Sequence, residues 1–256
     1  MLITEDVDNV NIKETFSMVE KNISLDVPPI GVLCWEEGQV ERGLLQFEQL
    51  PGSSNCPESF EFPVKYCRVK GANVYTILES PCPNVLQTMI DEALKMQKQG
   101  VRAITTSCGF NAIFQKELAD ALDIPVFTSS LLQVPLVNQM LNKNQAVGII
   151  TAKKSALTKI HMKSVGITDD ISIHIEGLEA SDQWSKIFSS PDKEVNIARI
   201  ENDVVEIACS MMERLDIGAF VLECTDIPPF SKAIRKATGR PVFDFGTLMK
   251  FVYLAI

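Results

Sequence analysis

The chain has 256 residues, of which 46% are hydrophobic and 22% are charged, and its formal net charge at pH 7 is -9. This composition is typical of a globular protein with a large core, and the negative charge excludes nucleic acid as a main partner because nucleic-acid affinity depends on neutralising phosphates. No apolar run approaches the roughly 20 residues of a membrane span, and the acidic start does not resemble a secretory signal. We therefore expect a cytoplasmic protein that does not associate with membranes.

The seven cysteines are an odd number, and without a secretory signal they are better interpreted as reduced thiols than as a disulfide framework. No two of them have the C-x-x-C spacing of a metal site, and the two histidines, His161 and His174, lie on a helical and a strand pattern. We predict neither a metal site nor a cofactor.

Residues 1–29 are polar and end in Pro28-Pro29, which we interpret as an N-terminal extension. From Ile30 onwards, short apolar runs alternate with helical patterns. Strand, helix and strand repeated in this way predict parallel sheets that are covered on both faces. The expected strands are residues 30–35, 63–69, 101–106, 125–129, 146–151, 171–177, 218–223 and 241–245.

The pattern is duplicated, because a shift of the sequence by 116 residues superposes the same residue types without a gap. The shift places Cys108 on Cys224, Phe114 on Phe230, Lys116 on Lys232, and Pro125-Val126-Phe127 on Pro241-Val242-Phe243. We therefore predict an α/β fold of two similar parallel-sheet lobes related by an approximate twofold, with an active site in the cleft between them. The first lobe would span residues 30–130 and the second residues 131–244, with residues 245–256 returning to the first.

Cys108 and Cys224 each follow a buried strand and precede a helical pattern, for which Asn111 is a candidate cap in the first lobe. Ligands bind at the carboxyl ends of strands in open α/β sheets, and a helix N-terminus lowers the pKa of a thiol. Two facing lobes would place these thiols on opposite walls of one cleft. One thiolate could remove a proton from a carbon while the other thiol returns one to the opposite face.

The pair SCGFN (107–111) and ECTD (223–226), each at the end of a buried strand in a duplicated α/β chain, resembles the aspartate/glutamate/hydantoin racemase superfamily. The resemblance covers roughly residues 30–256. It implies a cofactor-independent enzyme with Cys108 and Cys224 as catalytic cysteines and with Thr225 helping to hold a substrate carboxylate.

Other polar, thiol or aromatic residues at or after the strand ends are candidates for substrate binding. For Thr128 and Ser129 helix capping is the alternative, and for Cys34 a place in the core. The candidates are Cys34, Trp35, Ser107, Gly109, Asn111, Thr128, Ser129, Thr151, Thr225 and Asp226.

The leading hypothesis from the sequence is a racemase or epimerase, an isomerase that inverts a stereocentre next to a carboxylate or carbonyl. Its partner would be a small carboxylate-bearing substrate such as aspartate or glutamate. A maleate-type cis-trans isomerase and a hydantoin racemase are alternatives, as is a non-catalytic bilobed binding protein, which Trp35 and Asp226 favour. The sequence leaves open whether the chain forms a homodimer.

Overall fold

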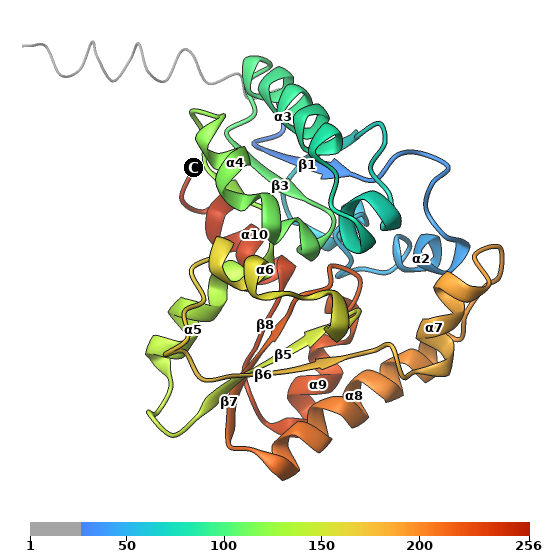
Figure 1. The fold of residues 1–256 in the computed structure, drawn as a ribbon, viewed down its shortest axis with the longest axis vertical. Coiled ribbons are helices and arrows are strands. Elements are labelled where there is room, and N and C mark those ends of the chain that lie inside the picture. Colours follow the sequence, from blue (N-terminus) through green and yellow to red (C-terminus); the bar gives the residue numbers. More distant parts are fainter. Residues whose placement is uncertain (1–26) are drawn as a thin grey trace, which may run out of the picture.

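The computed structural model describes residues 27–256, so most of the extension expected at residues 1–29 lies outside the described residues. The first four strands form one parallel sheet in the order β2-β1-β3-β4, and the last four form a second in the order β6-β5-β7-β8 (Figure 1). The prediction of two similar parallel-sheet lobes is confirmed. The strands are β1 (Ile30–Cys34), β2 (Val64–Arg68), β3 (Ala103–Thr106), β4 (Val126–Phe127), β5 (Ala146–Thr151), β6 (Ile173–Gly177), β7 (Ile217–Leu222) and β8 (Val242–Phe243).

Helices cover both sheets, as the sheets' burial requires. β1, β5 and β7 are buried at every position, which explains why they appear in the sequence as unbroken apolar runs. The α-helices are α2 (Arg42–Phe47), α3 (Pro83–Lys98), α4 (Gln115–Asp120), α5 (Val134–Met140), α6 (Lys159–Ser164), α7 (Asp182–Ser189), α8 (Ile197–Arg214), α9 (Ser231–Thr238) and α10 (Phe245–Tyr253).

Short non-α turns connect several strands to the helices that follow them. The ones near the strand ends that matter below are η2 (Tyr75–Glu79, a π-helix), η3 (Gly109–Phe114), η4 (Ser130–Gln133) and η6 (Pro228–Phe230), the last three being 3-10 helices.

The last helix, α10, lies against the first sheet although it follows the second in sequence. Its residues Phe245, Leu248 and Met249 share a buried cluster with Ile30 and Val32 of β1. The exact lobe boundary near residue 131 stays an interpretation.

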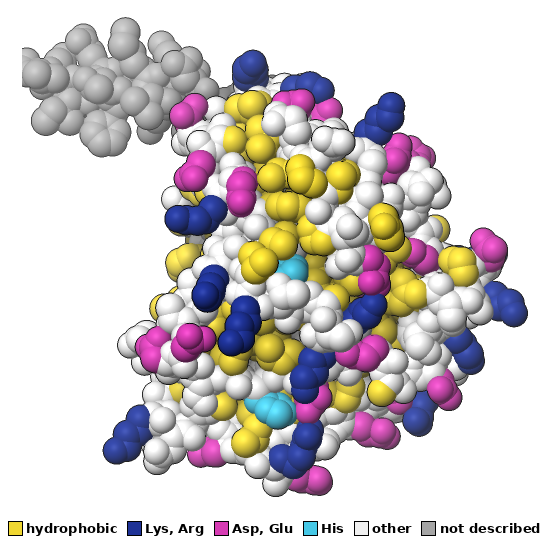
Figure 2. All heavy atoms as spheres, viewed as in Figure 1, with side chains coloured by type: hydrophobic (Ala, Val, Ile, Leu, Met, Phe, Trp, Pro, Cys, Tyr) yellow, Lys and Arg dark blue, Asp and Glu magenta, His cyan; other side chains and the backbone are white. Residues whose placement is uncertain are grey.

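The two lobes also touch through α2 and α7, which lie side by side (Figure 1). On the face drawn in Figure 2, hydrophobic side chains gather across the middle, between the lobes. Within residues 27–256 no helix combines the length and the apolar character that a membrane crossing requires.

Candidate active site

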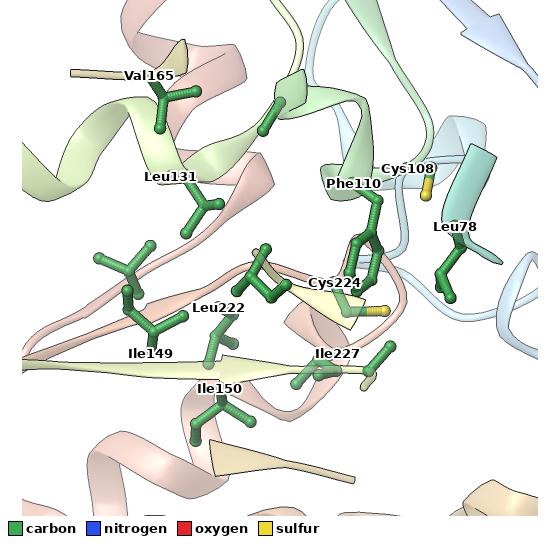
Figure 3. Close-up of a cluster of buried hydrophobic side chains, with 14 of the residues drawn as sticks. Leu78, Cys108, Phe110, Leu131, Ile149, Ile150, Val165, Leu222, Cys224 and Ile227 are labelled. Atoms are coloured by element: carbon green, nitrogen blue, oxygen red, sulfur yellow. The ribbon is translucent and has the colours of Figure 1, made fainter. Parts of the chain in front are cut away.

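Cys108 and Cys224 line one cavity between the lobes. Cys108 lies between β3 and η3, and Cys224 follows β7, so each is at the carboxyl end of a central strand. In the close-up, both sulfur atoms lie on the side of Leu78 (Figure 3). The cavity has an empty volume of about 560 Å³, including open space at its mouth. Its lining is Trp35, Val40, Leu44, Glu48, Asn55, Leu78, Ser107, Cys108, Gly109, Phe110, Ala152, Trp184, Phe188, Glu223, Cys224, Thr225 and Asp226.

Hydrogen bonds join the lobes beside the two cysteines. The Thr225 hydroxyl donates to the Ser107 carbonyl oxygen at 2.5 Å, and the Ser53 hydroxyl donates to Asp226 Oδ1 at 3.1 Å. The backbone N–H of Ser54 donates to the carbonyl oxygen of Thr225 at 3.1 Å. These contacts fix the loop after Cys224 against the first lobe, so both walls of the cavity hold a defined spacing.

Burial raises the pKa of both cysteine thiols above the ordinary value, Cys224 by a wide margin. For Cys108 the next largest cause is the negative charge of Glu223, and the backbone N–H groups of Phe110 and Asn111 act in the opposite direction. The expected lowering of the thiol pKa by a helix N-terminus is therefore wrong for the unliganded site. The segment after Cys108 is a 3-10 turn, and desolvation next to carboxylates outweighs its N–H donors.

Two carboxyl groups that line the cavity also have raised pKa values. Burial raises the pKa of Glu223 to about 7, against the hydrogen bonds from Thr151 and from the Ala152 backbone. Burial likewise raises the pKa of Asp226 to about 7, against the hydrogen bond from Ser53. Both carboxyl groups therefore titrate near neutral pH, where they gain or lose a proton with only a small change in free energy.

Asp226 makes stability depend on pH in a defined direction. Its pKa is about 7 in the folded chain against an ordinary value of 3.8, so the folded chain holds the proton more tightly and loses stability as pH rises from about 4 through 7. Asp226→Asn removes this titration. We expect the melting temperature of the variant minus that of the wild type to be about 5 °C larger at pH 8 than at pH 5. Thermal melts at both pH values measure this, and an unchanged difference would contradict it.

The lining of the cavity is acidic and aromatic. Glu48, Glu223 and Asp226 contribute carboxyl groups, and no lysine, arginine or histidine is among the lining residues. Arg68 pairs with Glu48 at 3.4 Å from outside the lining. The aromatic rings come from Trp35, Phe110, Trp184 and Phe188. Carboxylates and aromatic faces attract cations, so this cavity suits a positively charged group.

The structure brings part of the predicted site together. Besides the two cysteines, five of the candidates line the cavity, and their substrate contacts stay predictions. These five are Trp35, Ser107, Gly109, Thr225 and Asp226.

The remaining candidates are buried and are not among the residues that line the cavity. The Cys34 thiol donates a hydrogen bond to Asn55 Oδ1 at 3.3 Å, and the Thr128 hydroxyl donates one to Gln115 Oε1 at 2.9 Å. The Ser129 hydroxyl accepts from the Leu131 N–H and caps η4, which is the alternative that the sequence offered.

Thr151 and Asn111 are also buried and outside the lining. The Thr151 hydroxyl donates to Glu223 Oε2 at 2.6 Å, so it holds a residue of the cavity. Asn111 lies inside η3 and caps no helix, which corrects the capping role, because η3 begins at Gly109 and Cys108 occupies its N-cap position.

Sequence reasoning missed the acidic and aromatic lining. Glu223 stands directly before Cys224 at the end of β7, and that position was a usable signal. Glu48 follows the end of α2, and Trp184 and Phe188 lie on α7. All three are far from either cysteine in sequence, and no local pattern marks them. No group of three or more His, Cys, Asp or Glu side chains suited to a metal ion occurs within residues 27–256.

Solved structures with the same fold come from one superfamily. Allantoin racemase from Pseudomonas fluorescens superposes with a TM-score of 0.62 at 14% identity, over 88% of this chain and 89% of that one. An aspartate racemase homologue from Pyrococcus horikoshii has a TM-score of 0.57 at 14% identity, over 90% and 99%. The chain has the two-lobed α/β fold of the aspartate/glutamate/hydantoin racemase superfamily, which confirms the resemblance. No family model matches it.

The sequence relatives are more specific. The chain is 31% identical over 206 residues to a dimethylsulfoniopropionate lyase of Durusdinium sp. clade D, covering 77% of this chain and 67% of that protein. It is 31% identical over 203 residues to dimethylsulfoniopropionate lyase 3 of Emiliania huxleyi, covering 75% and 52%. The chain belongs to the dimethylsulfoniopropionate lyase family. It spans about half the length of the Emiliania huxleyi relative.

These relatives overturn the prediction of an amino-acid racemase, and with it the isomerase class. The racemase hypothesis rested on the duplicated fold and the two cysteine motifs, and neither feature specifies the substrate or the outcome of the reaction.

Proposed function

We propose that the chain cleaves dimethylsulfoniopropionate into dimethyl sulfide, acrylate and a proton. The observation that carries the proposal is the cavity itself, in which two cysteines face an acidic and aromatic lining without a positive charge. Dimethylsulfoniopropionate presents a sulfonium cation, which such a lining attracts. The family to which the chain belongs supports the same substrate.

The reaction needs one base and no acid. The base removes a proton from the carbon next to the carboxylate, and the C–H electron pair becomes the new C=C bond. The bond from the neighbouring carbon to sulfur breaks, and its electrons stay on sulfur, which leaves as neutral dimethyl sulfide. Because the leaving group is neutral, it requires no proton from the protein.

We assign the role of base to Cys108. Two backbone N–H groups, those of Phe110 and Asn111, favour its thiolate, whereas Cys224 has one such donor, from Asp226. A nearby sulfonium charge lowers a thiol pKa further, since a unit charge about 4 Å away contributes about 4 kcal/mol at an effective dielectric constant of 20. Substrate binding would thus favour the thiolate, which burial and the charge of Glu223 disfavour.

The two ends of the substrate would contact different parts of the cavity. The sulfonium group would lie near the rings of Trp35 and Trp184 and the carboxyl group of Asp226. The carboxylate would lie near Ser107 and Thr225, which are uncharged and polar at the seam between the lobes. The Thr225 hydroxyl already donates its hydrogen to Ser107, so its oxygen serves only as an acceptor. The donors for the carboxylate must then be the Ser107 hydroxyl and backbone N–H groups.

Two inhibitors of matched shape test the recognition of the cation. 3-(Trimethylammonio)propionate keeps a positive charge where the substrate has sulfur, and 4,4-dimethylpentanoate, with the same three methyl groups, has a neutral carbon there. We expect the cationic compound to inhibit at about tenfold lower concentration, because a desolvated cation over aromatic rings gains up to roughly 2 kcal/mol. The measurement is dimethyl sulfide in the headspace by gas chromatography. Equal inhibition would contradict the cation site, and no dimethyl sulfide from the wild-type chain would overturn the proposed function.

A further inference from the structure

Glu223 is a buried carboxyl group that the elimination described above does not use. It stands between β7 and Cys224, is fully shielded from solvent, and lines the cavity. Oε2 accepts the Thr151 hydroxyl at 2.6 Å, while Oε1 is buried and has no hydrogen-bond partner among residues 27–256. Leaving a carboxyl oxygen unpaired inside a protein is costly, so an unpaired oxygen at a reactive site indicates a role in the chemistry.

The unpaired oxygen lies against the residue that follows Cys108. A Cβ atom placed on Gly109 would be 2.3 Å from Glu223 Oε1 and 2.1 Å from the Glu223 carbonyl oxygen. The glycine therefore brings the first lobe into direct contact with this carboxyl group. Among the charges around the Cys108 thiol, that of Glu223 has the largest effect on its pKa.

The reaction produces a proton that has to leave the cavity. After each elimination the Cys108 thiol carries the proton taken from the substrate, and it must become a thiolate again before the next turnover. The cavity holds no histidine or lysine that could accept this proton. Glu223 and Asp226 are the carboxyl groups whose pKa lies near 7, and the charge of Glu223 affects Cys108 more strongly than that of Asp226.

We propose that the Glu223 carboxylate is the proton acceptor of Cys108, and this inference rests on the proposed function. As the sulfonium cation binds, the Cys108 S–H proton passes to Glu223 Oε1, leaving a thiolate and a neutral carboxylic acid. The thiolate then takes the proton from the substrate carbon, dimethyl sulfide leaves with the C–S electrons, and the thiol is restored. Glu223 finally releases its proton to solvent through the mouth of the cavity, so one proton leaves per substrate cleaved.

The groups that face Glu223 come from both lobes. Cys224 and Asp226 lie on the loop that follows it, Thr151 and the Ala152 backbone lie at the end of β5, and Cys108 comes from the first lobe. Of these, the Thr151 hydroxyl donates the hydrogen bond that lowers the pKa of Glu223. This allows the titration of Glu223 to be moved without removing the carboxyl group.

Glu223→Gln is the direct test, because it keeps the shape of the side chain and removes the proton acceptor. We expect kcat for dimethyl sulfide release to fall about 100-fold, with KM changed by less than about threefold. Alkylation of Cys108 by iodoacetamide without substrate should be as fast as in the wild type or faster, since the lost negative charge had raised the thiol pKa. A merely structural role would instead lower the melting temperature, so the variant must melt within a few degrees of the wild type for the loss of kcat to count. The matched control is Glu213→Gln on the exposed side of α8, which should retain wild-type kcat.

Thr151→Val gives a second, independent measurement. The wild-type kcat/KM should rise with pH through an inflection near 7, set by ionisation of Glu223, and Thr151→Val should move this inflection to higher pH. If the wild type is active and Glu223→Gln is equally active, this inference is wrong while the proposed function stands. The same holds if Thr151→Val does not move the inflection. A wild-type chain that releases no dimethyl sulfide would overturn the proposed function and this inference with it.

Discussion

Cys108→Ala is expected to release dimethyl sulfide about 100 to 10,000 times more slowly than the wild-type chain, which is the contribution that a positioned general base makes. The alanine has no proton acceptor, and the neighbouring lining residue Ser107 is far too weak a base to replace a thiolate. Its methyl group fits the space of the thiol, so we expect the melting temperature to change by only a few degrees. Headspace gas chromatography of dimethyl sulfide at saturating substrate measures the effect.

Cys209→Ala is the matched control for this variant. Cys209 lies on α8, outside the cavity, and is partly buried like an ordinary structural thiol. It should retain full activity. A Cys108→Ala protein that remains folded and keeps more than about a tenth of the wild-type rate would remove Cys108 as the base.

Cys224 provides a comparison that separates an elimination from a stereoinversion. An inversion needs an acid and a base on opposite faces, so loss of either cysteine stops it. An elimination with a neutral leaving group needs the base alone, and we expect Cys224→Ala to retain clearly more activity than Cys108→Ala. Losses of equal size in folded proteins would contradict the assignment of the base to Cys108 alone.

The sheets could be predicted from the sequence because burial makes them visible. β5 and β7 are buried at all positions and appear as continuous apolar runs, and the duplication revealed that the second sheet repeats the first. Several predicted strands extend one or two residues beyond the observed ends, as with residues 125–129, where β4 is Val126–Phe127. The residues that follow β4 continue in extended backbone, but they bond to side chains such as Gln115 instead of a neighbouring strand.

The chemistry of the cavity could be predicted only in part, because its electrostatics depend on contacts between the lobes. A cysteine after a strand predicts an activated thiol, yet at Cys108 burial and the charge of Glu223 raise the thiol pKa. Glu223 meets Gly109, the residue after Cys108, only once the two sheets pack together. The aromatic wall has the same origin, since Trp184 comes from α7, whose helix start is capped by Ser181 far from both motifs.

Gly109→Ala is expected to lower the melting temperature by about 5 to 10 °C and activity by about 100-fold or more. The added Cβ would lie 2.1 Å from the Glu223 carbonyl oxygen and 2.3 Å from its Oε1, and real Cβ atoms do not approach other atoms so closely. The chain must separate the two loops to make room, which moves Cys108 away from Glu223. A displacement of about 1 Å in a catalytic group can lower a reaction rate about 100-fold. The activity should therefore fall by more than the smaller fraction of folded protein would explain.

Gly246→Ala is the matched control for this substitution. Gly246 is near the start of α10, where an added Cβ would meet nothing closer than Asp244 Oδ1 at 3.4 Å, so stability and activity should stay close to those of the wild type. Thermal melts and dimethyl sulfide release compare the two variants. A Gly109→Ala chain as stable and active as Gly246→Ala would show that the loops can separate freely, and that close contact between Gly109 and Glu223 is not needed. Adding Glu223→Ala to Gly109→Ala removes the contact with Oε1 and leaves the one with the carbonyl oxygen, so it should restore only part of the lost melting temperature.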